Sequence, residues 1–242
     1  MQRVIHRVPI ALALVALAFT FIATAHASAK GAFSWLNAAK LKPMGTFNAD
    51  PGKPTQKFGI PLGSGSPAFT IACNQMSGGA VGGVGSATSS STLAFFLNKL
   101  ADSNPKGCFV EGVGSYATVT TPAFPCYVTY HSGTAVTGKF ETVNGTVDMS
   151  CPAGETGITF DIPGLCKITL KNNYATSAGP VSYRTNATKP LSVTAEAKVT
   201  TGLKYSTTGL CGTGTYEDGT YSGSTVLNGL DEEGQPTSLF VF

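Results

Sequence analysis

Apolar and polar residues alternate most regularly between Cys126 and Cys151. If this stretch folds back on Gly138-Lys139, Val128 lies opposite Met149 and the two cysteines lie opposite each other. Because side chains alternate between the two faces of a strand, only this register gathers the apolar side chains on one face. Glycine as the first residue of a two-residue turn also favours a type II′ hairpin. The pattern predicts a long β-hairpin with one cysteine at each open end.

The same alternation recurs on both sides of this hairpin. Turns rich in glycine and proline separate the alternating runs, and Gly202 is expected to turn the chain. Repeated short strands between such turns are typical of an all-β protein. Strands are predicted at residues 69–73, 116–121, 158–162, 166–170, 191–200 and 237–242.

Three segments are less regular. Residues 35–36 fit a short helix that Pro43 would end, and residues 77–92 read as a glycine- and serine-rich loop. Residues 93–100 fit a helix on spacing, and they fit a buried strand equally well because two phenylalanines are adjacent. The predicted fold is therefore an antiparallel meander or β-sandwich that is stapled by disulfides and has at most one or two short helices.

Composition supports this fold class. The 242 residues include 29 glycines, only 12% of them are charged, and 42% are hydrophobic. A chain with many glycines and few charges suits a sheet protein with many turns, and this one is too apolar to be disordered. Residues 67–242 are expected to form one disulfide-linked β domain, which an extension with turns at residues 30–66 precedes.

Residues 1–29 are typical of a secretory signal peptide. Two arginines supply a basic start, an apolar core follows as far as Ala25, and small residues supply a cleavage site. Cleavage after Ala25, Ala27 or Ala29 is compatible with this pattern, and an uncleaved membrane anchor is the alternative. The mature protein is expected to be secreted or to lie in the cell envelope.

The charge balance argues against one class of partner. Removing the leader removes two arginines and leaves 14 basic and 13 acidic residues. A nucleic-acid-binding protein normally carries a basic stripe, and Arg184 is the only arginine left in the mature chain. The sequence therefore argues against nucleic acid as a partner, and the mature chain is not expected to span a membrane.

All six cysteines lie after the leader. An even number in an exported chain indicates disulfides, and the lack of a Cys-x-x-Cys pair argues against a metal site. Strand direction brings Cys126 and Cys151 to one end of a hairpin, whereas Cys151 and Cys166 flank a strand and lie at opposite ends. Elimination and chain order then give the three pairs Cys73–Cys108, Cys126–Cys151 and Cys166–Cys211.

Five short motifs occur together between about residues 67 and 230. They are the strand that ends in Cys73, the turn Cys151-Pro152-Ala153-Gly154, the strand led by Cys166, the run Cys211-Gly-Thr-Gly and the run Asp218-Gly-Thr-Tyr-Ser-Gly. Together they resemble a group of exported bacterial six-cysteine β-proteins of uncharacterised function. Residues 30–66 and the phenylalanine-rich run 93–100 depart from that pattern. The resemblance implies export and an all-β fold, and it implies no activity or site residue.

Few residues are candidates for chemistry. His131 and Ser132 are neighbours in a strand and point to opposite faces, so they cannot form a catalytic pair. Glu217 and Asp218 are candidate acids for glycoside hydrolysis, and the acids at 231–233 are candidates for calcium binding. Both groups lie beside glycines in expected turns, where acids are simply hydrated. We therefore assign no catalytic, cofactor-binding or metal-binding residue, and no cofactor, from the sequence.

These observations favour an exported, non-enzymatic β-module with a binding or structural role in the cell envelope or outside the cell. Its ligand is not defined, although exposed tyrosines could bind a carbohydrate or another envelope component if they are not packed between strands. One alternative is an extracytoplasmic hydrolase that acts on polysaccharides through Glu217 and Asp218. A second alternative is an outer-membrane β-barrel, prompted by the apolar residues 239–242.

Overall fold

The described part of the chain consists of strands, turns and connections. The computed structural model describes residues 31–35, 44–49, 56–62, 69–80, 89–90, 92–101, 107–122, 126–136, 141–152, 157–172, 181–231 and 233–242. Within these ranges there are eighteen β-strands and no helix, and every strand pairing is antiparallel. The predicted all-β, disulfide-stapled fold class is confirmed. The signal peptide expected at residues 1–29 lies outside the described residues.

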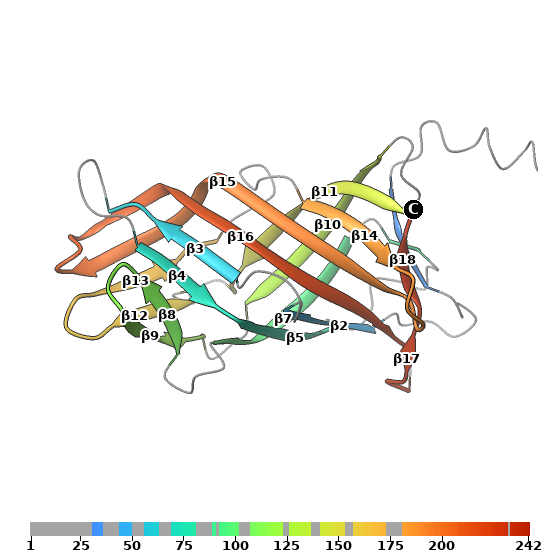
Figure 1. Cartoon of the computed structure of the whole chain (residues 1–242), viewed down its shortest axis with the longest axis horizontal. Helices are drawn as coiled ribbons and strands as arrows, with labels where there is room; N and C mark the ends of the chain where they lie inside the picture. The colour runs from blue at the N-terminus through green and yellow to red at the C-terminus, as the bar shows by residue number, and fades with distance from the viewer. Residues whose placement is uncertain are drawn as a thin grey trace, which may run out of the picture.

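Most of the strands belong to two closed rings (Figure 1). In the first ring each of eight strands is hydrogen-bonded to the next, and the last pairs with the first. Closing a sheet in this way removes its edge strands. In ring order the strands are β2 (Met44–Ala49), β5 (Gln75–Ala80), β7 (Thr92–Ala101), β10 (Tyr127–Ala135), β11 (Thr142–Ser150), β14 (Val181–Asn186), β15 (Ser192–Gly209) and β16 (Gly214–Leu230).

The second ring shares β15 and β16 with the first and adds six strands. In ring order these are β13 (Cys166–Leu170), β12 (Thr159–Ile162), β9 (Ser115–Thr120), β8 (Cys108–Glu111), β4 (Phe69–Cys73) and β3 (Gln56–Ile60). The ring closes where β3 pairs with β16, at Phe58 opposite Tyr221. A short strand, β17 (Pro236–Thr237), pairs with the other end of β16.

The hairpin of β15 and β16 runs along the molecule and is a wall of both rings (Figure 1). The first half of β15 pairs with β14, and the second half pairs with β13 from Leu170 opposite Tyr205. Between these halves the register against β16 shifts after Val199, and Gly202 there has a φ of 94°. The prediction that Gly202 turns the chain is wrong, because a glycine at positive φ also fits a bulge inside a continuing strand.

The central hairpin of β10 and β11 has the predicted register. Val128 lies opposite Met149, and Tyr130 lies opposite Val147. All four side chains belong to the core or pack against it. A bulge near the end of β10 shifts the pairing by one residue, and the turn predicted at residues 138–139 lies outside the described residues. The alternating pattern was therefore sufficient to place this hairpin.

The chain passes back and forth between the rings, and two disulfides lie at the crossings. It leaves the second ring at Cys73, at the end of β4, and returns at Cys108, at the start of β8. It leaves again at Cys126, just before β10, and returns at Cys151, just after β11. The bonds Cys73–Cys108 and Cys126–Cys151 therefore each close the base of an excursion into the first ring.

The third disulfide, Cys166–Cys211, ties the start of β13 to the turn between β15 and β16. A further crossing follows β13, where the Asn172 side chain accepts a hydrogen bond from the Cys151 amide (2.8 Å) and donates one to the Cys151 carbonyl oxygen (3.4 Å). All three disulfides are the pairs expected from the sequence. Three disulfides indicate an oxidising, extracytoplasmic environment.

A separate three-stranded sheet caps one end of the first ring. Its strands are β6 (Ser89–Ser90), β1 (Phe33–Trp35) and β18 (Leu239–Val241), with β1 in the middle. Phe33 is fully buried, and its ring meets Tyr183 of β14 edge-on with centroids 5.1 Å apart. Figure 1 shows this sheet at the end of the molecule where the C-terminus lies. The cap thus brings the two ends of the described chain together.

Two segments differ from the sequence interpretation. Residues 30–66, expected to precede the β domain, contribute β1 to the cap, β2 to the first ring and β3 to the second. Trp35, expected in a short helix, lies in β1. Each of these strands pairs with partners far along the chain, so local spacing alone could not place them.

The run at residues 93–100, for which helix and strand fitted equally, lies in β7. Leu93, Phe95 and Leu97 are buried, and β5 and β10 pair with the strand on either side. The loop predicted at residues 77–92 also contains strand residues, because β5 extends to Ala80, β6 covers Ser89–Ser90 and β7 begins at Thr92.

Candidate functional site

A cavity of about 70 Å³ lies where the first ring meets the second, and we refer to it as the junction cavity. Most of its wall is apolar. Strands that are far apart in the chain supply this wall, because the two rings bring them together around the shared hairpin. Representative side chains are Phe58 of β3, Met76 of β5, Leu97 of β7, Val128 of β10 and Met149 of β11.

On one side of the cavity the wall is formed by β11 and β15, and no described strand pairing joins these two strands. β11 pairs with β14 as far as Gly145 opposite Val181, and β14 pairs with β15 up to Val181 opposite Ala197. Beyond this point Val147 and Met149 of β11 face the cavity, and within the described residues β11 makes no pairing with β15. Both side chains are only half-buried, so this side is the candidate entrance.

Polar groups gather on the β16 side of the cavity. The Tyr130 hydroxyl and Thr225 Oγ1 share a hydrogen bond of 2.9 Å. The Tyr221 hydroxyl donates to Gln56 Oε1, and Gln56 Nε2 donates to the Ser224 carbonyl oxygen at 2.8 Å. Burial raises the pKa of the Tyr130 hydroxyl, because a phenolate would be desolvated there. At neutral pH these groups therefore act as hydrogen-bonding hydroxyls and not as anions.

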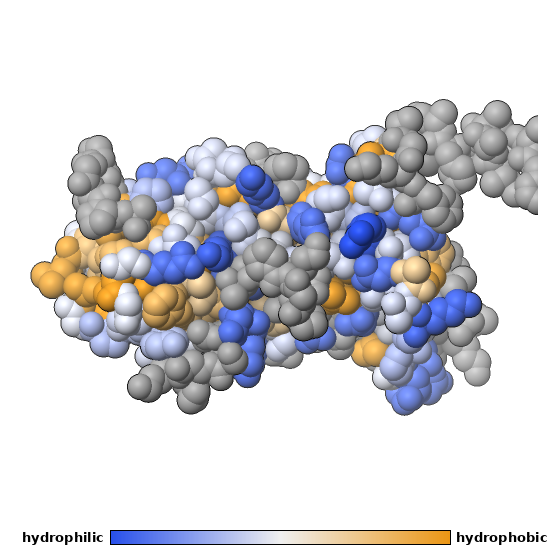
Figure 2. All heavy atoms as spheres, in the orientation of Figure 1, coloured by the Kyte–Doolittle hydropathy of each residue, from blue (hydrophilic) through white to orange (hydrophobic). Residues whose placement is uncertain are grey.

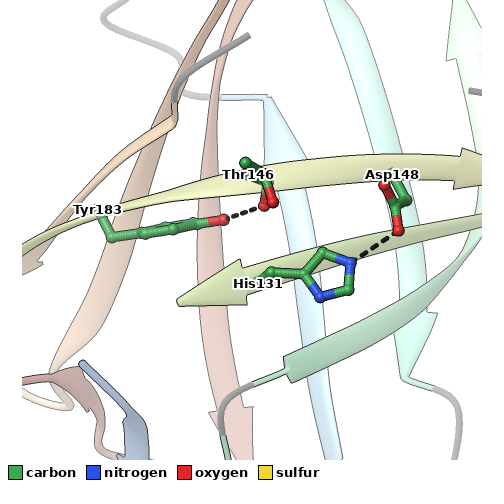
Figure 3. Close-up of polar contacts among 4 residues, drawn as sticks. All are labelled: His131, Thr146, Asp148 and Tyr183. Carbon is green, nitrogen blue, oxygen red and sulfur yellow. Dashed lines mark hydrogen bonds and ion pairs between the residues drawn. The ribbon is translucent and has the colours of Figure 1, made fainter. Parts of the chain in front are cut away.

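Asp148 lies between the wall residues Val147 and Met149, but its side chain points to the opposite face of β11, where His131 holds its carboxylate (Figure 3). His131 Nε2 lies 2.8 Å from Asp148 Oδ2. Asp148 Oδ1 is buried, and no described residue donates a hydrogen bond to it. Close by, the Tyr183 hydroxyl donates to the Thr146 carbonyl oxygen at 2.7 Å, and burial raises the pKa of this hydroxyl too. The structure thus places one unsatisfied acceptor in an otherwise satisfied polar region.

His131 lies opposite Thr146, as the hairpin register predicted. Its side chain is 31% exposed and carries the ion pair with Asp148 described above. The sequence analysis excluded a catalytic pair of His131 with Ser132 and did not anticipate this partner. Asp148 lies two residues beyond the directly opposed position, and long side chains reach such diagonal neighbours across a hairpin.

The two candidate acids of the hydrolase alternative lie in β16. Glu217 forms an exposed ion pair with Lys204 at 3.1 Å. Asp218 Oδ1 accepts a hydrogen bond of 2.9 Å from the Tyr205 hydroxyl. As neighbours in a strand, the two acids point to opposite sides, so the structure does not bring their carboxylates together over one substrate.

The acids considered for calcium form an ordinary turn. Asp231 Oδ1 accepts hydrogen bonds from the Glu233 amide (3.0 Å) and the Gln235 amide (2.7 Å). Glu232 lies outside the described residues. Among the residues that the structure describes, no three His, Cys, Asp or Glu side chains are grouped so as to hold a metal ion.

Tyr174 lies outside the described residues, and the described tyrosines considered for sugar binding are engaged with other rings. Tyr127 packs on Phe96 with centroids 5.0 Å apart, and Tyr205 stacks on Tyr216 at 5.2 Å. Tyr183 is fully buried. These contacts correspond to the packing between strands that the sequence left open as the alternative.

Figure 2 shows apolar surface at the end of the molecule where β15 turns into β16. Leu210, in this turn, is 80% exposed. Its amide donates a hydrogen bond to the Leu165 carbonyl oxygen, which fixes the turn against β13. A single exposed leucine is normal on a protein surface and does not define a binding site.

Two further findings bear on the assignment. No helix in the described ranges is long and apolar enough to cross a membrane. In comparisons with known proteins, no family model, curated protein or solved structure matches this chain. The candidate site therefore rests on geometry.

The sequence analysis did not predict the junction cavity. Part of its signal was present, since the apolar face of the central hairpin supplies Val128, Tyr130, Val147 and Met149 to the wall. The remaining wall comes from strands whose pairing the local pattern does not encode. The bulge at Gly202, which also lines the cavity, was interpreted as a turn.

Proposed function

We propose that the mature chain is an exported, non-enzymatic binding module that takes a compact apolar molecule into the junction cavity. It acts in the cell envelope or outside the cell. The signal-peptide pattern at residues 1–29 and the disulfides support export. The resemblance to exported six-cysteine β-proteins supports the same location.

The junction cavity is the observation that carries this proposal. Protein interiors are packed nearly as densely as organic crystals, so a hollow inside a core is an exception that lowers stability. Ligand sites are typically apolar with a few placed polar groups. The junction cavity has this composition, with Phe58, Leu97 and Met149 among its apolar walls and Tyr130 and Thr225 among its polar groups.

The size of the cavity limits its ligand. Its volume of about 70 Å³ is smaller than the roughly 150 Å³ of an engineered apolar cavity that binds benzene. A space of this size takes a short hydrocarbon chain, or a small ring that projects through the half-buried side at Val147 and Met149. Apolar walls also favour such a molecule over a carbohydrate, whose hydroxyls would lose hydrogen bonds to water on entering.

Thiophene, a small apolar ring, tests the proposal. Met76 and Met149 both line the cavity, so their ¹³C-labelled methyl groups report on binding in NMR spectra. We expect both signals to shift on titration with thiophene. Ala197→Phe, which adds a ring to the wall, should abolish the shift, whereas Lys198→Phe adds the same ring at the exposed neighbouring position and should not.

Two results would count against a binding role for the cavity. One is a wild-type protein whose Met76 and Met149 signals do not respond to thiophene. The other is an equal response in the Ala197→Phe and Lys198→Phe variants, because binding would then occur elsewhere.

The export part of the proposal has its own test. Intact-mass measurement of the extracytoplasmic protein should show a chain that begins between residues 26 and 30, since cleavage after Ala25, Ala27 or Ala29 fits the leader. A chain that retains Met1 would contradict it.

A further inference from the structure

Hairpin turns of the second ring gather at the end of the molecule opposite the cap (Figure 1). Three of these turns are described, at residues 112–114, 163–165 and 210–213. Cys166 lies opposite Gly209, which places the last two turns side by side, and the pairing of β12 with β9 brings the first turn to the same end. We refer to these three turns as the tip.

The tip exposes apolar side chains. Leu210 is 80% exposed, and Pro163 is exposed as well. Val113 and Leu165 are half-buried. None of the three turns contains a lysine, arginine, aspartate or glutamate, and Figure 2 shows apolar surface at this end. Leu210 is therefore part of an uncharged apolar tip and is not an isolated exposed leucine.

The backbone of the tip is held in place. The Leu210 amide donates a hydrogen bond of 2.8 Å to the Leu165 carbonyl oxygen, and each of the three turns also closes with an internal hydrogen bond of 3.0 to 3.1 Å. The disulfide Cys166–Cys211 joins two of the turns. Apolar side chains that are already ordered bind at a lower entropic cost, and backbone groups that are already paired lose less when they leave water.

The surface becomes polar where the strands of the second ring begin. The rings of Phe109 and Tyr116 lie against each other on β8 and β9, with centroids 5.4 Å apart, and both are half-buried. A lipid interface has the same order, in which hydrocarbon is followed by a polar layer where aromatic rings and charged groups lie. Three exposed ion pairs, each of one base and one acid, form a belt without net charge on these strands: Lys57–Glu111, Lys167–Asp161 and Lys204–Glu217.

A protein partner fits the tip less well than a membrane does. The three turns contain three, three and four residues, whereas a stable protein interface uses about 20–30 residues on each side. A bilayer needs no matching face, because binding to it scales with the apolar area that is buried at the boundary of head groups and acyl chains.

We propose that the tip docks this protein on the surface of a lipid membrane without crossing it. Leu210 enters the outer hydrocarbon, and the belt of ion pairs stays among the head groups. Because the belt carries no net charge, docking does not require anionic lipid. The proposal goes beyond the proposed function, since it does not depend on the junction cavity.

Vesicles of phosphatidylcholine test the proposal. The exported protein should sediment with them, and Leu210→Asp should weaken binding by about tenfold or more, because an apolar side chain is replaced by one that stays in water. Phe242→Asp is the matched control, since Phe242 is 43% exposed and lies at the opposite end of the molecule. It should leave binding unchanged. Circular dichroism checks that both variants fold.

Leu210→Trp, which keeps the tip apolar, shows which end enters the bilayer. The only tryptophan of the wild-type protein, Trp35, lies in β1 of the cap. Lipid that is brominated along its acyl chains quenches tryptophan fluorescence on contact. The Leu210→Trp variant should therefore lose fluorescence on such vesicles, and the wild-type protein should not.

Four results would overturn the proposal. The wild-type protein could stay in the supernatant, or Leu210→Asp and Phe242→Asp could weaken binding equally. The Leu210→Trp variant could bind without quenching, and this result also decides the matter if Leu210→Asp does not fold. Finally, analytical ultracentrifugation could show a wild-type dimer that Leu210→Asp dissociates, because the tip would then bind a second copy of the chain.

Discussion

Gly145 lies at a position in the first ring where no side chain larger than a hydrogen atom fits. A Cβ atom on Gly145 would lie 1.9 Å from the His131 carbonyl oxygen and 2.6 Å from Tyr183 Cε2. This glycine lets the Tyr183 ring lie against β11 and its hydroxyl reach the Thr146 carbonyl oxygen. The absence of a side chain at Gly145 therefore leaves room for the fully buried Tyr183 ring, which lies beneath the cap.

Gly145→Ala should lower the free energy of unfolding by about 1–3 kcal/mol, the usual effect of forcing extra atoms into a packed core. Urea unfolding at neutral pH measures it. Asn144→Ala, at the exposed neighbouring position, should change the free energy by no more than about 0.5 kcal/mol. Equal stability of the two variants would show that the His131 carbonyl group and the Tyr183 ring both move aside without cost.

Single residues were predictable from the sequence only where the reason was local. The position of His131 opposite Thr146 followed from the hairpin register. The role of Gly145 did not, because the ring that fills its space belongs to β14 and is not near in the sequence. The unsatisfied oxygen of Asp148 was likewise invisible, since the pattern of a single strand does not show which donors lie near a side chain.

The positions of strands could be predicted from the sequence where one face of the strand is buried. The alternation of apolar residues placed β10 and β11 and the hairpin of β12 and β13, because both members of each pair are close in the chain. It did not decide between helix and strand for β7, where Phe95 and Phe96 are adjacent. It also could not show that β2 and β3 belong to different rings, because both pair with the distant strand β16.

The disulfide Cys126–Cys151 is expected to stabilise the central hairpin of β10 and β11. It closes a loop with a sequence separation of 25 residues, which in the chain-entropy model stabilises the folded state by about 3 kcal/mol. Replacing both cysteines by serine should lower the melting temperature by about 6–12 °C, at about 2–4 °C per kcal/mol for a chain of this size. Differential scanning calorimetry measures the change.

Non-reducing peptide mapping is the direct check on this element. A peptide that links Cys126 to Cys151 is expected, and one that links Cys126 to Cys108 or Cys166 would contradict the hairpin register. An unchanged melting temperature in the double variant would instead show that the ladder of β10 and β11 holds the register without the cross-link.

At the scale of the whole molecule, the shared hairpin makes the two rings interdependent. β15 and β16 are walls of both rings, and the buried residues form a single hydrophobic cluster that extends through both. Neither ring can lose this hairpin and remain closed. We therefore expect the molecule to unfold in one cooperative, all-or-none transition.

Trp35, the only tryptophan, offers a test because it lies in β1 at the capped end of the first ring. Ile168 is fully buried in β13 of the second ring, and Ile168→Ala should cost about 2–5 kcal/mol. If the rings unfold together, the thermal midpoint measured by Trp35 fluorescence should fall by the same amount as the midpoint measured by far-ultraviolet circular dichroism. Lys167→Ala, at the exposed neighbouring position, should shift neither midpoint appreciably. A fall in the circular dichroism midpoint with unchanged Trp35 fluorescence would mean that the first ring survives the loss of the second, and the shared hairpin would then be a boundary between two folding units.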